Sequence, residues 1–298
     1  MALVKEKKSK LKKSWSPLTV FMFIVLSLYG LFLLFLLCWA FITTFKTQQD
    51  FRLNKLGLPK DWVWNYSFVY KMFYVPINTA AGRAKVDMPG LIMNSVLYSV
   101  GCAFFNTLVP CLTSYICAKY RYKFSKVMYW TVLITMIVPM VGSTPAEIKM
   151  AQDFHFYDNI WGLWIMKANF LGTYFLVFYY KFKAMPDTFA EAARIDGAGH
   201  FGILFRIILP LSVNTFFTVF LINFITFWND YQVPYMYLPN HPTLAQGMYH
   251  MAGTKENGLS RVPMRLTGAM IQSVPIIILF MIFQGKVMGN LTVGGIKG

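Results

Sequence analysis

The chain has 298 residues, of which 56% are apolar and only 13% are charged, and its mean hydropathy is +0.48. A soluble domain of this length needs more polar surface than this composition supplies, so a water-soluble globular protein is excluded. The formal net charge is +16, but the basic clusters flank apolar stretches. This placement indicates topology control and attraction to lipid headgroups, and it argues against nucleic-acid binding.

The apolar stretches predict an all-α membrane protein. A helix needs about 20 mostly apolar residues to cross the hydrocarbon core. On that basis we predict six transmembrane spans, which form one domain over residues 18–287: Leu18–Phe45, Leu91–Ala118, Ser125–Val141, Ile160–Phe182, Ile203–Phe227 and Leu266–Val287. The first span is too long for a secretory signal and no small-residue cleavage site follows it, so we interpret it as a retained span that can lie at the periphery.

The basic residues predict the orientation, because short cytoplasmic loops retain positive charge. Six lysines lie in the arm at residues 1–17, and four basic residues follow the second span: Lys119, Arg121, Lys123 and Lys126. Both segments are therefore expected on the inside. With six spans, the loop at 185–202 and the tail at 288–298 are also expected in the cytoplasm. The first outer loop, which also carries several basic residues, fits this rule less well.

The segment between the fourth and fifth spans has a distinctive spacing: Glu191-Ala192-Ala193, three residues, Gly197, nine residues, and then Ile207-Ile208-Leu209-Pro210. Asp187 is a good N-cap whose carboxylate can accept hydrogen bonds from free backbone N–H groups. We predict a short helix from Thr188 that carries Phe189, Ala192 and Ala193 on one side. Gly197 can take the left-handed backbone that ends a helix, and Pro210 fits early in the next helix.

This spacing resembles the signature loop of permease subunits in binding-protein-dependent ABC importers. The run Ile195-Asp196-Gly197-Ala198 resembles the sugar branch, and the chain is similar to the smaller permease of the maltose-type systems. The resemblance implies the type I ABC importer permease fold, with a cytoplasmic coupling helix in loop 185–202 that docks on an ATPase subunit. It assigns this coupling role to Glu191, Ala192, Ala193, Asp196, Gly197, Ile207, Leu209 and Pro210.

The same resemblance implies the rest of the assembly. A second, different permease, two ATP-binding subunits and an extracytoplasmic solute-binding protein are the expected partners, in a bacterial or archaeal cytoplasmic membrane. The tail, with Gly294, Gly295 and Lys297, is expected to contact the ATPase dimer. The chain has no Gly-x-x-x-x-Gly-Lys-Ser/Thr loop, so ATP and Mg²⁺ are expected on the partners, with no cofactor and no enzymatic activity in this chain.

Polar and aromatic side chains in the spans are the candidates for a translocation pathway, because such groups are costly in lipid unless they face a cavity or another helix. The candidates are Asn94, Asn106, Asn223, Trp228, Asn229, Asp230 and Gln272. Hydrogen bonding between helices is an equally good interpretation of the amides. An aromatic belt at the membrane interface is an alternative for the rings. Cysteine and histidine show no metal or catalytic spacing.

Two outer loops remain. Residues 232–262 contain many turn formers, which argues against a long continuous helix. The resemblance implies that this loop reaches into the binding protein, although a plain connector is the alternative. The stretch Tyr74–Asp87 lengthens the first outer loop.

The chain is thus expected to be a permease subunit of an ATP-driven carbohydrate importer. The alternatives are import of a non-sugar solute such as a polyol phosphate, or an ATPase-independent channel or carrier. The near absence of ionisable groups inside the spans, Lys167 apart, argues against a channel or carrier.

Overall fold

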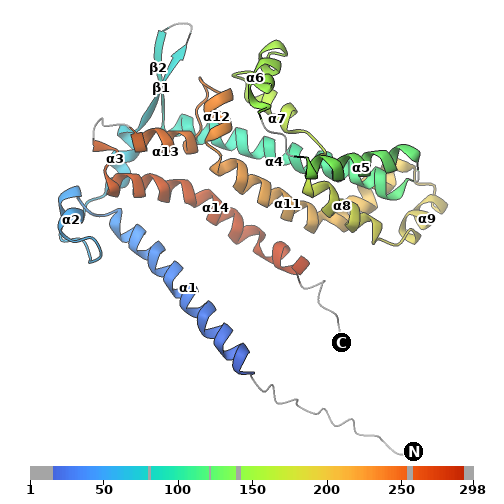
Figure 1. Cartoon of the computed structure of the whole chain (residues 1–298), viewed down its shortest axis with the longest axis horizontal. Helices are drawn as coiled ribbons and strands as arrows, with labels where there is room; N and C mark the ends of the chain where they lie inside the picture. The colour runs from blue at the N-terminus through green and yellow to red at the C-terminus, as the bar shows by residue number, and fades with distance from the viewer. Residues whose placement is uncertain (1–15, 80–81, 121, 139–141, 254–257, 292–298) are drawn as a thin grey trace, which may run out of the picture.

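The computed structural model of this chain describes residues 16–79, 82–120, 122–138, 142–253 and 258–291, without the side chains of 286–291. The described elements (Figure 1) are α1 (Pro17–Thr43), α2 (Gln48–Leu53), α3 (Asn65–Met72), β1 (Tyr74–Thr79), β2 (Gly82–Asp87), α4 (Met88–Lys119), α5 (Lys123–Ile137), α6 (Thr144–Asp153), α7 (Ile160–Lys167), α8 (Thr173–Lys183), α9 (Thr188–Ile195), α10 (His200–Ile203), a π-helical segment (Leu204–Ile208), α11 (Leu209–Asn229), α12 (Gln232–Tyr237), α13 (Leu244–Gly253) and α14 (Val262–Leu291).

Within the described residues, four helical segments are long and apolar enough to cross a membrane: α1, α4, the continuous run His200–Asn229, and Val262–Gly285 of α14. They coincide with the predicted first, second, fifth and sixth spans. These helices therefore follow from local hydropathy alone.

The other two predicted spans differ from expectation. Helix α5 has 15 residues, roughly 22 Å of helix, against a hydrocarbon core of about 30 Å. The predicted end of this span at Val141 lies outside the described residues. The predicted span Ile160–Phe182 is divided into α7 and α8 by the non-helical residues 168–172, in which Ala168 leaves the helix with a ψ of 62° and Gly172 has a φ of 118°. Six continuous spans are therefore not confirmed.

The core of the molecule lies where α4 packs against α7, α8 and α11, and α11 in turn packs against α14. Buried residues of this core include Tyr98, Leu163, Phe224 and Trp228. Gly101 allows α7 to approach α4 closely, since a Cβ at Gly101 would lie within 2 Å of the Trp164 ring. The Trp164 indole N–H also donates to the Leu97 carbonyl at 3.0 Å. Together these contacts set the position of α7.

Helix α1 lies outside this core. It contacts α14 and then runs away from the bundle toward the N-terminus (Figure 1). None of the most apolar part of α1 is buried within the chain. A helix that is apolar all round and contacts so little protein requires lipid or another membrane protein around it.

One element departs from the predicted all-α fold. Strands β1 and β2 form an antiparallel hairpin in which Tyr74 pairs with Asp87 and Thr79 with Gly82. Val75 of β1 is buried in the core cluster, which anchors the base of the hairpin. The long first outer loop thus has structure of its own.

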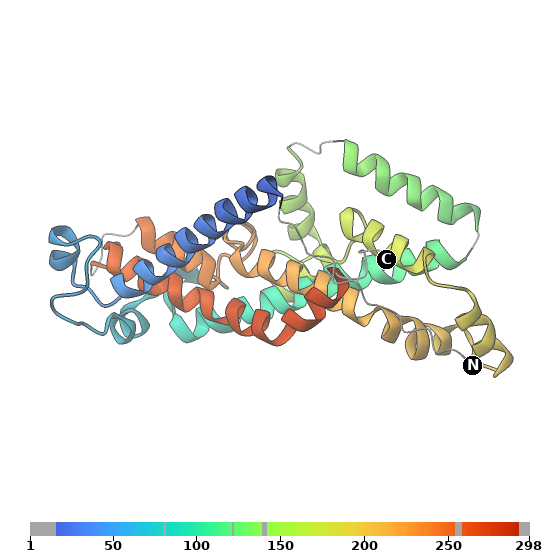
Figure 2. The ribbon, with the colours of Figure 1, turned by 90° about the horizontal axis from the view of Figure 1, so that it is seen from below.

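The two ends of the molecule are built differently. Helices α2, α3 and α13 and the hairpin gather at one end, whereas α9 lies at the opposite end (Figures 1 and 2). The described part of 232–262 contains the short helices α12 and α13 and no long continuous helix, as the turn formers predict. Two candidate sites therefore lie apart in the described structure. One surrounds α9, and the other lies where α11 meets α13 and α14.

Candidate functional site

The first candidate site is the α9 segment, and its start is held by an ion pair. Asp187 is the N-cap residue of α9, as predicted, but its carboxylate makes no capping hydrogen bond. Instead it accepts a hydrogen bond from Lys119 Nζ at 2.7 Å. Lys119 Nζ also donates to the Met185 carbonyl at 2.6 Å. The predicted capping role is therefore wrong, because the last residue of α4 lies close enough to take the carboxylate.

The end of α9 has the geometry expected from the sequence. Gly197 has a φ of 81°, and its N–H donates to the Arg194 carbonyl at 3.0 Å. The Ala198 N–H reaches back to the Ala193 carbonyl at 2.8 Å. This pair of bonds is a Schellman motif, in which a left-handed glycine ends the helix and satisfies two free carbonyls.

Helix α9 spans Thr188–Ile195, so Phe189, Ala192 and Ala193 lie on one side of it, as predicted, but they differ in burial. Ala193 is buried against the chain's own cluster, which includes Phe182, Ile203 and Ile208. Phe189 and Ala192 are exposed, so of the three only Ala193 packs on the bundle. Ile195 is 87% exposed. Ala193 is the small residue that lets α9 pack on its own bundle, and the exposed side carries Phe189, Ala192 and Ile195.

Of the other residues assigned to this loop, some are exposed to solvent and some pack on the bundle. Glu191 and Asp196 are exposed, whereas Ile207 and Leu209 pack against the buried cluster. Pro210 lies at the start of α11, directly after the π-helical turn Leu204–Ile208. A proline in a continuous helix removes an N–H and crowds the preceding turn, and a π-helical turn widens that turn. Pro210 is therefore compatible with one helical run from His200 to Asn229.

Sequence reasoning missed two residues that fix this segment. The Tyr120 hydroxyl lies 2.8 Å from His200 Nδ1, and this contact joins the end of α4 to the start of α10. Together with the Lys119 contacts it holds α9 and its flanks on α4. The basic cluster at Lys119 was visible in the sequence, but its spatial partner was not.

The second candidate site lies where α11 ends. Trp228 donates its indole N–H to the Gln272 carbonyl at 2.8 Å, and Gln272 Nε2 donates to Asn229 Oδ1 at 3.2 Å. Three predicted pathway residues, far apart in the sequence, therefore meet between α11 and α14. Asp230 follows directly as the C-cap of α11, and its Oδ1 accepts hydrogen bonds from the N–H groups of Gln232 and Val233, the first two residues of α12.

A cavity of about 560 Å³ opens beside this contact. Asn229 and Gln272 line it together with Tyr231, Tyr249 and Arg265. The rings of Tyr231 and Tyr249 stack, with 4.7 Å between centroids and 14° between planes. Amides beside a pair of exposed aromatic rings are suited to a polar ligand with an apolar face. Tyr249 and Arg265 were not among the predicted site residues.

The remaining predicted pathway residues do not line this cavity. Asn223 is buried and donates to Thr107 Oγ1 of α4 at 3.0 Å, which is a bond between helices. Asn94 donates to the Pro242 carbonyl at 3.0 Å, and Asn106 is partly buried. For Asn223 and Asn94 the structure shows helix-to-helix and helix-to-loop bonding, the interpretation that the sequence left open.

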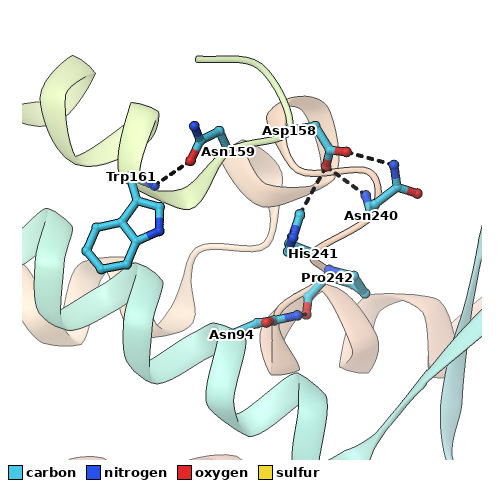
Figure 3. Close-up of polar contacts among 7 residues, drawn as sticks. All are labelled: Asn94, Asp158, Asn159, Trp161, Asn240, His241 and Pro242. Carbon is cyan, nitrogen blue, oxygen red and sulfur yellow. Dashed lines mark hydrogen bonds and ion pairs between the residues drawn. The ribbon is translucent and has the colours of Figure 1, made fainter. Parts of the chain in front are cut away.

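A polar junction joins the turn before α7 to the loop before α13 (Figure 3). The Asp158 carboxylate accepts from the Asn240 backbone N–H at 2.9 Å, from Asn240 Nδ2 at 2.7 Å and from His241 at 3.3 Å. Asp158 has a φ of 56°, a left-handed backbone that aspartate tolerates better than most residues. Nearby, burial raises the pKa of Tyr237, whose hydroxyl donates to Glu147. The junction ties the turn before α7 to the loop before α13.

Comparisons with known proteins agree with this architecture. Residues 111–250 match the family described as the inner membrane component of binding-protein-dependent transport systems. The chain is 21% identical to the diacetylchitobiose uptake system permease protein NgcG of Streptomyces coelicolor, over 91% of this chain and 86% of that protein. It is 25% identical to AmyC of Thermoanaerobacterium thermosulfurigenes, a probable starch degradation products transport system permease protein, over 94% and 96%.

Two further comparisons bear on solute and fold. The chain is 26% identical to the sn-glycerol-3-phosphate transport system permease protein UgpE of Yersinia pestis, over 73% of this chain and 75% of that protein. A crystal structure of a bacterial ABC transporter involved in import of the acidic polysaccharide alginate contains a chain with the same fold. Its TM-score is 0.72 at 20% identity, over 89% of this chain and 95% of that chain. Residues 111–250 of this chain thus match the inner membrane component of binding-protein-dependent transport systems, and most of the chain is similar to permease proteins such as NgcG and AmyC.

Proposed function

We propose that this chain is one permease subunit of an ATP-driven carbohydrate importer. It pairs with a second, different permease, docks on two ATPase subunits through α9, and receives its solute from an extracytoplasmic binding protein. Both termini lie in the cytoplasm. The printed names of the relatives NgcG and AmyC support a saccharide as the solute.

One observation carries the proposal: a continuous helical run joins the two candidate sites. The α9 segment ends at Gly197, and the run His200–Asn229 begins three residues later and ends at the cavity lined by Asn229. Thirty residues of helix span roughly 45 Å, more than the hydrocarbon core. A displacement of α9 is thus transmitted along one rigid element to the far end of the bundle.

The exposed side of α9 supports docking. Phe189, Ala192 and Ile195 present apolar surface at the end of the molecule, on a helix fixed at both ends by Lys119 and Gly197. An apolar patch on a rigid, short helix is suited to a cleft in another protein. ATP then closes the ATPase dimer, α9 moves with its cleft, and the bundle reorients between inward-facing and outward-facing states. This is a population shift that results from the different affinities of the two states for ATP.

Uptake by intact cells tests the proposal. A panel of labelled mono- and oligosaccharides is offered to cells with the native chain, cells without it, and cells with Gly197→Asp. We expect one glycan to be taken up only by cells with the native chain, although the Gly197→Asp protein is still inserted in the membrane. Normal uptake by that variant would show that α9 is not the coupling element.

A polyol phosphate is the second candidate solute. The resemblance to the glycerol-3-phosphate permease supports it, and so does the arginine in the cavity. Including glycerol 3-phosphate in the uptake panel separates the two. If no glycan but this phosphate depends on the chain, the importer assignment stands and the carbohydrate assignment is wrong.

A further inference from the structure

The cavity at the end of α11 has a charge that nothing in its lining compensates. Arg265 of α14 is its one ionisable group apart from the tyrosines Tyr231 and Tyr249, and no carboxylate lines it. Among the described residues Arg265 forms no salt bridge. Arg265 is exposed at the cavity, so its guanidinium is accessible to a ligand from solution. A guanidinium without a counter-charge beside it favours an anion, because it can donate two parallel hydrogen bonds to a carboxylate or phosphate.

Asp230 stands in the sequence between the lining residues Asn229 and Tyr231, and its carboxylate is already occupied. Asp230 accepts a hydrogen bond from the Tyr98 hydroxyl at 3.0 Å on Oδ2, and two backbone N–H groups donate to its Oδ1. These bonds direct the carboxylate toward α4 and the start of α12. Asp230 is thus a structural residue at this turn and does not neutralise Arg265.

The positions on α14 place the cationic and amide groups on one face. Arg265 and Gln272 are seven residues apart, which is two helical turns, and both line the cavity. Gln272 uses one N–H for Asn229, so its Oε1 and its second N–H remain for a ligand hydroxyl. The stacked rings of Tyr231 and Tyr249 complete the wall with a flat apolar surface.

These groups have a consistent chemical preference. Aromatic rings contact the C–H face of a sugar ring, amides bind its hydroxyls, and a guanidinium binds a carboxylate or phosphate through two parallel hydrogen bonds. We propose that this cavity is a binding subsite for an anionic saccharide, that is, a sugar or polyol that bears a carboxylate or phosphate group. The inference rests on the proposed function and narrows its substrate class.

Arg261 supplies a matched control. It lies one helical turn before Arg265, but it lines a different pocket together with Arg52 and Asp61. Replacing Arg261 by glutamine removes the same charge from the same outer region without touching the proposed subsite. An effect of bulk electrostatics would appear with both variants, and an effect of the subsite only with Arg265→Gln.

The test uses the complete transporter, with its partner permease, ATPase and binding protein, reconstituted in vesicles. Uptake is measured as a function of concentration for three solute series: uronate-containing oligosaccharides, the matching neutral oligosaccharides, and sugar or glycerol phosphates. Comparing the uronate series with the phosphate series shows whether the bound anionic group is a carboxylate or a phosphate. Stimulation of ATP hydrolysis by the loaded binding protein is recorded in parallel.

We expect the native transporter to take up one of the two anionic series. Arg265→Gln should raise the KM for that solute by about tenfold or more, because it removes the bidentate partner, and Arg265→Lys should have a smaller effect. Arg261→Gln should leave KM unchanged. Equal effects of Arg265→Gln on neutral and anionic solutes, or no effect on either, would overturn the inference.

The two levels of the proposal fail separately. Uptake of neutral oligosaccharides alone overturns the anionic subsite and leaves the carbohydrate importer in place. If none of the three series is transported although the loaded binding protein stimulates ATP hydrolysis, both the subsite and the carbohydrate assignment are wrong.

Discussion

The carboxylate of Asp187 lies 2.7 Å from Nζ of Lys119, and this contact joins the first residues of the α9 segment to the end of α4. Asp187 is largely exposed, whereas Lys119 is only 11% exposed and also binds the Met185 carbonyl. A lysine in this position fixes the connection before α9 by both charge and packing of its stem. The proposed coupling helix is therefore held by a residue that lies outside the signature spacing.

We expect Lys119→Met to weaken coupling without preventing insertion. Exposed ion pairs contribute at most about 1 kcal/mol, so the bundle should remain folded while α9 loses its fixed position. Uptake should fall several-fold at an unchanged amount of protein in the membrane. Lys126→Met is the control, since Lys126 is exposed and forms no salt bridge among the described residues. Equal loss of uptake in both variants would indicate a general charge effect.

Gly197→Ala should be more damaging than Gly199→Ala. Gly197 has a left-handed backbone, in which a Cβ costs roughly 1–2 kcal/mol, whereas Gly199 has a φ of −72°. Neither position has an atom within 4 Å of a built Cβ, so backbone conformation is the relevant difference. Uptake and the ATPase activity stimulated by the binding protein should fall only for Gly197→Ala. The hypothesis of a rigid helix end would not survive equal behaviour of the two variants.

We expect Asn223 to contribute to the stability of the fold and not to the affinity for solute. Its amide donates to Thr107 in the buried contact between α11 and α4. Asn223→Ala should lower the free energy of unfolding by about 1 kcal/mol, and a double-mutant cycle with Thr107→Val should give a coupling of about 0.5–1.5 kcal/mol. Thermal unfolding in detergent measures both. A raised KM with unchanged stability would instead place Asn223 in the pathway.

Asp158→Asn should loosen the outer junction of Figure 3. The substitution keeps a residue type that tolerates a left-handed backbone, but an NH2 group replaces one of the two acceptor oxygens, so the hydrogen bonds from the Asn240 N–H and from Asn240 Nδ2 cannot both be kept. We expect a loss of about 1–3 kcal/mol in stability, seen as faster hydrogen exchange at residues 238–243. Asp153→Asn, at an exposed position of α6, is the control and should change neither quantity.

Local properties of the sequence predicted most of the long helices and turns of this protein. Apolar runs predicted the four long helices, and turn formers predicted the broken helices after α11, since both depend on neighbouring residues. The left-handed end of α9 followed from Gly197 for the same reason. The predicted fourth span shows where this reasoning fails, because averaged hydropathy does not detect a short non-helical stretch such as residues 168–172, which divides α7 from α8.

Only the tertiary structure decided which polar groups meet. Lys119 and Asp187 are 68 residues apart and Asn229 and Gln272 are 43 apart, so no local pattern pairs them. The same holds for Ala193, whose burial depends on the cluster beneath α9. The sequence alone thus determined the class of protein, its long apolar helices and the left-handed end of α9 at Gly197, since these follow from solvent preference and backbone chemistry. Packing of distant helices decided the lining of the cavity, because a side chain's partners depend on what the fold brings beside it.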